Sequence, residues 1–262
     1  MYSQAAYRSL LQLAVDEGYQ FINFFDERPA EGKFIYLRHD IDWSLKLALQ
    51  VAEVNHSLGI SATFFMLLRG HNYNFFDHRI LDDIRAIHAL GQHIGFHYAL
   101  PPVIPADDEA FINLIKQDFE VFAREFPQTD PIFAWHNTTP QVIEWGLTHE
   151  IPGLLNVYSK PLFKDIAYYS DSLARYTVPE LEAIIRRGHP AIQLLFHPGI
   201  WCGGGENLNE ISTHLWRAII RHNDADPTGL DKSVAHHLPY RIPDALLDAL
   251  DDAILSRENT HT

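Results

Sequence analysis

The chain has 262 residues, which is enough to bury a large hydrophobic core that needs no stabilising cross-links such as disulfides. It carries 20 Lys and Arg against 34 Asp and Glu, and the net charge of −14 argues against a nucleic-acid backbone as partner. The single cysteine, Cys202, excludes an internal disulfide. No signal pattern begins at Met1 and no apolar run reaches about 18 residues, so we expect a soluble, cytoplasmic protein without a membrane span.

Short apolar runs alternate with helical patterns along the chain. In chain order, we expect strands at about 34–38, 61–66, 93–97, 131–135, 153–157 and 191–196. We expect helices at about 47–58, 80–90, 111–126, 179–187, 208–221 and 243–255. Gly59 and Gly91 are typical helix stops.

Strands that alternate with helices of this length predict parallel βαβ units. No glycine-rich dinucleotide turn follows the first strand, which favours a barrel over an open sheet. The sequence therefore predicts an α/β fold, a distorted (β/α) barrel of six to seven parallel strands. We expect one domain over residues 1–262, with a core at about 34–200 and N-terminal and C-terminal helices packed on it.

Polar residues follow four of the expected strands, and barrels of this kind place their active sites at the carboxyl ends of the strands. These polar ends are Arg38–Asp42, His97–Tyr98, Trp135–Asn137 and His197–Pro198. Carboxylate and imidazole are the ligands that zinc and similar divalent ions prefer. The pattern therefore indicates a metal site at one rim of the barrel.

Asp40 and Asp42 are two residues apart, so in a strand both side chains point to the same face. That spacing suits one carboxylate on a metal and the other on the water beside it. The alternative is that Asp42 or Ser44 caps the following helix. His93 and His97 span about 13 Å of strand, so only one can bind the ion, and His97 at the strand end is the better candidate.

The other candidates also have ordinary structural interpretations. His136 is equally compatible with a loop histidine beside Trp135, and His197 with a buried structural imidazole. Asp171 is compatible with an Asx turn.

At these residues the chain resembles the polysaccharide deacetylases, the carbohydrate esterases with a NodB-homology fold. Asp40 and Asp42 are similar to the family's paired base and metal aspartates. The run 59–65 resembles the family's second strand, and the run 91–97 places His97 on the first metal histidine. Leu195–His197 is similar to the closing motif, whose histidine is the general acid.

Two positions depart from the family pattern. The second metal histidine is expected four residues after His97, where this chain has Pro101. The arginine that orients the base is not found near Trp135. We expect His136 to replace the missing ligand, and Arg38 to hold Asp40.

The resemblance implies metal-dependent hydrolysis of an N-acetyl group on a sugar. Zn²⁺ or another divalent transition metal would lie on Asp42, His97 and His136, with Asp40 as base and His197 as acid. The supporting residues that we expect to position these groups or to contact the sugar are Arg38, His39, Tyr98, Trp135, Tyr169, Asp171 and Trp201.

A longer pattern resembles a subgroup associated with surface-polysaccharide and O-antigen biosynthesis: Leu37–Asp42, Tyr73–Asn74, Tyr169–Ser172 and His197–Pro198 with Trp201. The implied partner is an acetylated sugar, a nucleotide-sugar or a lipid-linked glycan. Two alternatives remain open at this point. One is a hydrolase of small-molecule amides, and the other is a non-catalytic barrel that binds a glycan or a protein partner.

Overall fold

A computed structural model describes residues 1–224. Its strands all lie in one parallel sheet of eight strands. The strands are β1 (Tyr19–Phe21), β2 (Lys33–Ile41), β3 (Thr63–Leu67), β4 (His93–Ala99), β5 (Ile132–His136), β6 (Leu155–Asn156), β7 (Ala167–Ser170) and β8 (Ala191–Phe196).

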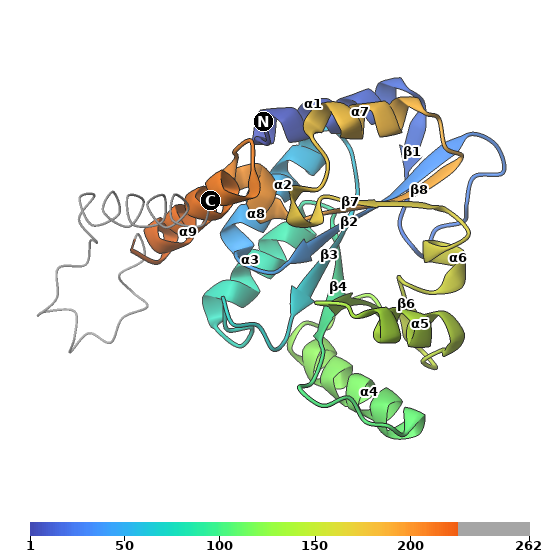
Figure 1. The fold of residues 1–262 in the computed structure, drawn as a ribbon. Coiled ribbons are helices and arrows are strands. Elements are labelled where there is room, and N and C mark those ends of the chain that lie inside the picture. Colours follow the sequence, from blue (N-terminus) through green and yellow to red (C-terminus); the bar gives the residue numbers. More distant parts are fainter. Residues whose placement is uncertain (225–262) are drawn as a thin grey trace, which may run out of the picture.

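Helices follow most of these strands and surround the sheet (Figure 1). They are α1 (Gln4–Asp16), α2 (Leu45–Ser57), α3 (His78–Ala89), α4 (Asp108–Glu125), α5 (Pro140–Thr148), α6 (Lys160–Phe163), α7 (Val178–Arg186), α8 (Pro198–Gly203) and α9 (Leu208–Asp224), with the 3₁₀ turn η1 at Ser172–Ala174. None of the helices in this described part is long and apolar enough to cross a membrane.

The strand order is β6-β5-β4-β3-β2-β8-β7, and β1 pairs with the beginning of β2. The sheet curls into a distorted (β/α) barrel, which confirms the predicted fold class. Within the described residues the two ends of this order, β6 and β7, are not paired with each other, so the barrel stays open there. All four strands that carry the predicted site residues therefore end at the same rim.

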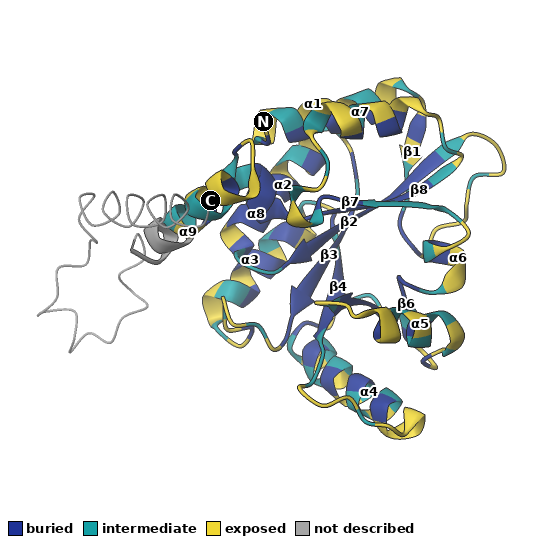
Figure 2. Cartoon of the chain, viewed as in Figure 1, coloured by how far each residue is buried: buried dark blue, intermediate teal, exposed yellow. Residues whose placement is uncertain are grey.

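The core lies on both faces of the sheet, and Figure 2 shows the strands buried and the outer helix faces exposed. β2 is an inner strand between β3 and β8, and every residue from Phe34 to Ile41 is buried. Because both faces are buried, alternate residues of β2 enter two different environments. This alternation decides which of its polar side chains reach the site.

Most of the predicted elements are present with bounds shifted by a few residues. Gly59 and Gly91 follow α2 and α3 with φ of +67° and +78°, the left-handed conformation that glycine adopts without strain. Pattern analysis did not identify β1, β7, α5, α6 or α8. The expected strand at 153–157 is reduced to β6. The expected helix at 243–255 lies outside the described residues.

Candidate metal centre

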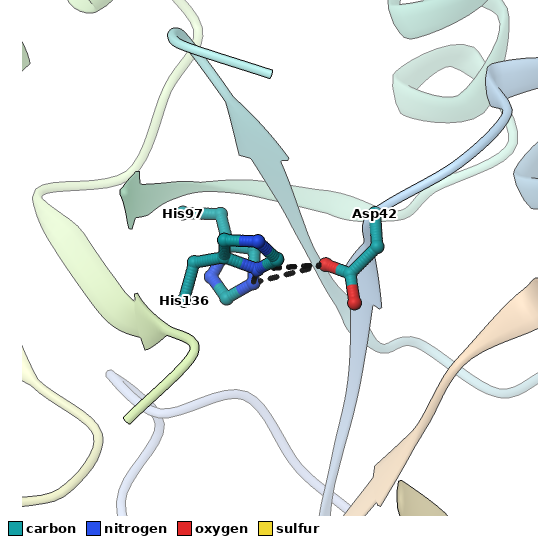
Figure 3. Close-up of side chains that lie close together, drawn as sticks. All are labelled: Asp42, His97 and His136. Carbon is teal, nitrogen blue, oxygen red and sulfur yellow. Dashed lines mark hydrogen bonds and ion pairs between the residues drawn. The ribbon is translucent and has the colours of Figure 1, made fainter. Parts of the chain in front are cut away.

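Three ligand side chains converge at the rim because of the register of the parallel strands. Asp42 follows β2 directly, and His97 and His136 lie near or at the ends of β4 and β5. In the β4–β5 pairing, Ala99 is the partner of His136, so the ends of these two strands lie side by side. Figure 3 shows both imidazole rings facing the Asp42 carboxylate.

The three ligand atoms form a nearly equilateral triangle. His97 Nε2 and His136 Nδ1 each lie 3.2 Å from Asp42 Oδ1, and the two nitrogens lie 3.2 Å from each other. Ligands of a tetrahedral zinc ion, at about 2.1 Å from the metal, are separated by about 3.4 Å. The spacing therefore fits three protein ligands of one divalent ion, with coordination positions left over.

The chemistry of these atoms also fits a cation. His97 Nδ1 donates to the Ala134 carbonyl oxygen at 3.1 Å, which leaves a lone pair on Nε2 of the neutral ring. Asp42 Oδ1 is buried and no hydrogen bond of acceptable geometry reaches it. Acceptor atoms crowded in this way repel one another unless a cation or a proton lies between them.

His136 is held from its other side by the residue that follows it. Its Nε2 lies 2.9 Å from Asn137 Nδ2; with this amide turned by 180°, Asn137 Oδ1 accepts from Nε2–H and the lone pair on Nδ1 is left for a cation. Asn137 has a φ of +51°, a left-handed conformation that asparagine adopts more readily than most other non-glycine residues. This conformation lies directly beside a proposed ligand.

The Asp42 carboxylate is strongly held in its charged form. Burial by itself would raise its pKa, but the contacts with His136 and His97 and the charge of His197 outweigh burial. The pKa of Asp42 is therefore well below its ordinary value. Ser44, not Asp42, caps α2, because its Oγ accepts from the Leu47 amide at 3.4 Å. The helix cap thus leaves Asp42 free to bind a cation.

Asp40 lies on the same face of β2 and is oriented by Arg38. The fully buried guanidinium donates from Nη2 to Asp40 Oδ2 at 3.1 Å. Arg38 also donates to Tyr158 Oη at 2.7 Å and to Gln193 Oε1 at 3.0 Å. Asp40 Oδ1 is buried without a hydrogen-bond partner, and Asp40 lines the cavity beside the three ligands. Asp40 Oδ2 is thus fixed by Arg38, and Asp40 Oδ1 is available to accept a hydrogen bond or a proton.

His197, at the end of β8, is held by a buried carboxylate. Asp171 Oδ1 lies 2.6 Å from His197 Nδ1, and Asp171 Oδ2 accepts from the His197 amide and the Trp201 indole, both at 2.9 Å. Burial disfavours the imidazolium, but the charge and hydrogen bond of Asp171 outweigh it and raise the pKa of His197 to about 9. Its Nε2 lies 3.7 Å from Asp42 Oδ2, so the ring reaches the centre.

The structure corrects three of the predicted supporting residues. His39 is fully buried on the opposite face of β2, where its ring contacts Tyr7 Oη at 3.1 Å. Tyr98 is 1 % exposed and packs against Trp135 in the outer layer. Trp135 borders the cavity, but its ring stacks on Phe111 and is buried, so it has no open face for a sugar. Each follows or precedes a residue that faces the site, and in a strand such neighbours point the other way.

Two further aromatic residues do not offer a face to a sugar. The ring of Trp201 is buried and donates to Asp171, so Trp201 supports the site by holding that carboxylate. Tyr169 lies away from the cavity, and its hydroxyl contacts His189 Nε2 at 3.0 Å. His93 lies outside the centre, as expected, and its Nδ1 contacts Asp130 at 2.8 Å.

Sequence analysis missed four residues of the site: Trp43, Asn137, Tyr158 and Gln193. Gln193 had a detectable signal, because a glutamine inside the apolar run 191–196 needs a polar partner. Its amide nitrogen donates to the Val157 and Leu162 carbonyl oxygens, which directs its oxygen to Arg38. Tyr158 had no comparable signal, because only the fold brings it to Arg38.

No protein-family model and no curated protein sequence matches this chain. The fold is similar to a CE4 family pseudoenzyme from Bacillus anthracis, at a TM-score of 0.42 and 15% identity, over 74% of this chain and 61% of that one. A peptidoglycan N-acetylglucosamine deacetylase gives a TM-score of 0.41 and 15% identity, over 79% and 87%. The chitin deacetylase of Colletotrichum lindemuthianum gives a TM-score of 0.34 and 14% identity, over 61% of this chain and 84% of that one. This chain thus covers less than two thirds of the length of the pseudoenzyme.

Proposed function

We propose that this protein is a metal-dependent hydrolase that removes the acetyl group from an N-acetylated sugar. One observation carries the proposal: three acceptor atoms at 3.2 Å from one another lie beside a buried free carboxylate oxygen and a carboxylate-held imidazole. These are the groups that hydrolysis of an amide requires, and they come from four different strand ends. The resemblance assigned these roles to Asp40, Asp42, His97 and His197, whereas His136 was expected as the replacement for the histidine missing at Pro101.

Asp42, His97 and His136 would hold Zn²⁺ or another divalent transition metal. When bound, such an ion polarises an acyl oxygen and lowers the pKa of water to about 7. Asp40 Oδ1 is free to take a proton from the attacking water, and Arg38 fixes the carboxylate through Oδ2.

His197 is placed to protonate the leaving amine. With a pKa of about 9 it carries its proton at neutral pH, and Asp171 fixes the ring through Nδ1. Amine departure needs a proton on nitrogen, because an amide anion is a very poor leaving group. In this proposal Asp40 is the general base and His197 is the general acid.

The proposed substrate is an acetylated sugar in cytoplasmic synthesis of a surface polysaccharide such as O-antigen. Support for this setting comes from the resemblance of the segments at 37–42, 169–172 and 197–198. The acidic chain is poorly suited to a polyanionic polymer, which favours a nucleotide-sugar or lipid-linked precursor.

The test combines metal binding with acetate release from N-acetylglucosamine derivatives. Zinc affinity is measured by chelator competition for the wild type and for His97→Ala, His136→Ala and His93→Ala. His93 is the matched control, because it lies on the same strand as His97 but contacts Asp130 instead. We expect both ligand variants to lose at least about a hundredfold in affinity, since removal of even outer partners of ligands costs 10–100-fold.

Acetate release should require added zinc or cobalt and stop with chelator, in the wild type and in His93→Ala alike. A protein that binds no metal would refute the proposal, as would amide hydrolysis that persists in excess chelator. Unchanged zinc affinity of His136→Ala would remove this residue from the ligand set. Hydrolysis of simple amides at a rate equal to that of acetylated sugars would favour a small-molecule amide hydrolase.

A further inference from the structure

The cavity beside the proposed centre is larger than one acetylated sugar ring requires. Its volume is about 630 Å³, within the range of sites that bind drug-sized molecules. Asp40, Asp42, His97 and His197 lie along it together with residues from five other segments. The remaining space must therefore be matched by a part of the substrate other than the hydrolysed amide.

One wall of this cavity is polar. It is formed by the β5–α5 connection and by the segment after β7. Hydroxyl and amide groups of Asn137, Thr138, Ser170 and Ser172 line it. The Arg175 guanidinium lies there too, and its Nε donates to the Ser172 carbonyl oxygen at 3.1 Å. Such groups suit the hydroxyls of a sugar.

The part of the cavity lining that comes from α8 and α9 is apolar apart from Ser212. Ile200, Ile211 and Leu215 are buried residues that line it, and Leu208 lies beside them with 41% of its surface exposed. Ser212 is the only polar residue that α9 contributes to the cavity within the described part of the chain. A sugar face alone does not use a wall of aliphatic side chains, because its hydroxyls would lose water without gaining partners.

Trp43 joins this apolar wall to the catalytic machinery. Its ring centroid lies 5.9 Å from that of His197. The ring packs where Gly199 leaves space, since a Cβ there would lie 2.6 Å from Trp43 Cε3 and 3.0 Å from Leu215 Cδ1. The apolar surface therefore begins next to the acid and runs outward along α9. We define the apolar wall as Trp43, Ile200, Leu208, Ile211 and Leu215.

Leu173 adds a second, independent observation. This cavity residue is 73% exposed and has a φ of +59°, and the next residue, Ala174, has a φ of +48°. A left-handed conformation is unfavourable for such residues because the Cβ approaches the following carbonyl oxygen. Leucine has no polar side chain that offsets this cost, and its exposure contributes no burial. Strain of this kind is typical of segments that contact ligands.

We propose that the substrate is amphipathic, with its sugar on the polar wall and an aliphatic group on the apolar wall and Leu173. This inference rests on the proposed function and defines the substrate class of the same site. The aliphatic group is larger than the acetyl methyl. It has two possible chemical sources, namely the acyl chain on the nitrogen or an aglycone attached to the sugar.

Two series of compounds separate these sources. In the first, glucosamine carries N-acetyl, N-butanoyl, N-hexanoyl or N-octanoyl groups. In the second, N-acetylglucosamine carries a methyl, butyl, hexyl or octyl aglycone, used below the micelle concentration. For zinc-loaded full-length protein, kcat/KM is measured from the amine released. In one series kcat/KM should rise by up to about fourfold per added methylene, the factor expected when that methylene is fully buried. In the other series kcat/KM should not change with chain length.

Binding gives a readout that does not depend on hydrolysis. Dissociation constants of methyl and octyl glucosaminides, and of free hexanoate and octanoate, are measured with zinc-free protein. We expect the longer member of one pair to bind at least tenfold more tightly. The inference would be overturned if neither the two kinetic series nor the two binding pairs depended on chain length. It would also be overturned if a nucleoside diphosphate sugar bound more tightly than every aliphatic compound. If binding depends on chain length but nothing is hydrolysed, the proposed hydrolase activity fails while the amphipathic site stands.

Leu173→Asn tests the wall without disturbing the core, because asparagine tolerates the left-handed conformation and position 173 is exposed. We expect it, like Leu208→Asn, to remove about threefold or more of the chain-length advantage, measured as the ratio of kcat/KM for the longest and the shortest compound within each variant. Val103→Asn is the matched control, since Val103 is 81% exposed and does not line the cavity. An equal loss in the control and in Leu173→Asn would contradict the assignment.

Discussion

Two polar clusters, one buried and one partly buried, lie on opposite faces of β2 and differ in how their hydrogen bonds are satisfied. The outer cluster is Tyr7, His39, Asn55 and Gln92, which lie beneath the helices. The inner cluster is Asp40, Asp42, His97 and His136, at the rim of the barrel. In the outer cluster Asn55 Oδ1 accepts from Tyr7 Oη at 2.6 Å, and Gln92 bonds to three backbone groups.

The inner cluster has the opposite property. Asp40 Oδ1 and Asp42 Oδ1 are buried without hydrogen bonds, and each such atom costs about 1–3 kcal/mol. A fold tolerates this cost where the atoms serve a ligand or a reaction. The comparison therefore teaches that burial and polarity alone do not mark a site. In this protein the site is marked by two carboxylates that each have an unpaired oxygen and lie beside imidazole nitrogens.

The largest expected effect comes from removing the free base of the inner cluster. In Asp40→Asn the side chain keeps its shape and can still accept from Arg38, but it loses basicity. We expect kcat to fall by about 10²–10⁴-fold, with zinc affinity and thermal stability close to those of the wild type. Steady-state kinetics and chelator competition measure the two quantities. Normal kcat in this variant would show that Asp40 is not the base.

The matching change in the outer cluster should affect stability and leave catalysis intact. Asn55→Ala leaves Tyr7 and His39 with fewer partners in a fully buried site. We expect a loss of about 2–3 kcal/mol in the free energy of unfolding, measured in urea, with unchanged kcat. The control is Gln12→Ala, an exposed residue of α1 that should cost less than about 0.5 kcal/mol. A large drop in kcat would mean that the clusters are coupled.

A smaller effect is expected on the pH profile when the support of His197 is altered. Asp171→Asn removes the charge that raises the pKa of His197 to about 9, so this pKa should fall. Since the acid must carry its proton, the alkaline limb of the kcat profile should move to lower pH. A shift of about two pH units would reduce activity at pH 8 about tenfold. A limb that stays in place would exclude His197 as the titrating acid.

The smallest effect concerns acid stability and the outer cluster. Burial lowers the pKa of His39 from 6.5 to about 3. Between these two values the unfolded chain binds a proton at this residue and the folded chain does not, so the free energy of unfolding falls as pH falls. The contribution is at most about 1.4 kcal/mol per pH unit. His39→Gln should reduce the slope between pH 6 and 4, and an identical slope would show that other groups cause it.

Much of the architecture was predictable from sequence because local patterns determine it. Apolar runs and helical periodicity located the strands that carry the site, and Gly59 and Gly91 marked two helix ends. β7 was missed because its four residues, Ala167–Ser170, are mostly half-buried and show no continuous apolar run. The expected ligands were found at strand ends, where parallel barrels place their chemistry.

The side-chain roles were harder to predict, for two separate reasons. The facing of His39 and Trp135 follows from strand alternation, so the sequence contained that signal once Asp40 and His136 were assigned inward. The position of His136 beside His97 depends instead on the β4–β5 register, which is a long-range property. The Arg38–Tyr158 contact likewise depends on how the chain after β6 folds back.

The position of β2 between β3 and β8 has a consequence for which sequence changes this protein tolerates. Insertion or deletion of one residue between Phe34 and Leu37 would turn every later side chain of the strand to the other face. His39 would then enter the rim, while Asp40 would be placed under the helices, so stability and cation binding would be lost in one step. A second inserted residue would restore the facing of both. Length variation within this strand is therefore restricted to even numbers, whereas single substitutions on either face act independently.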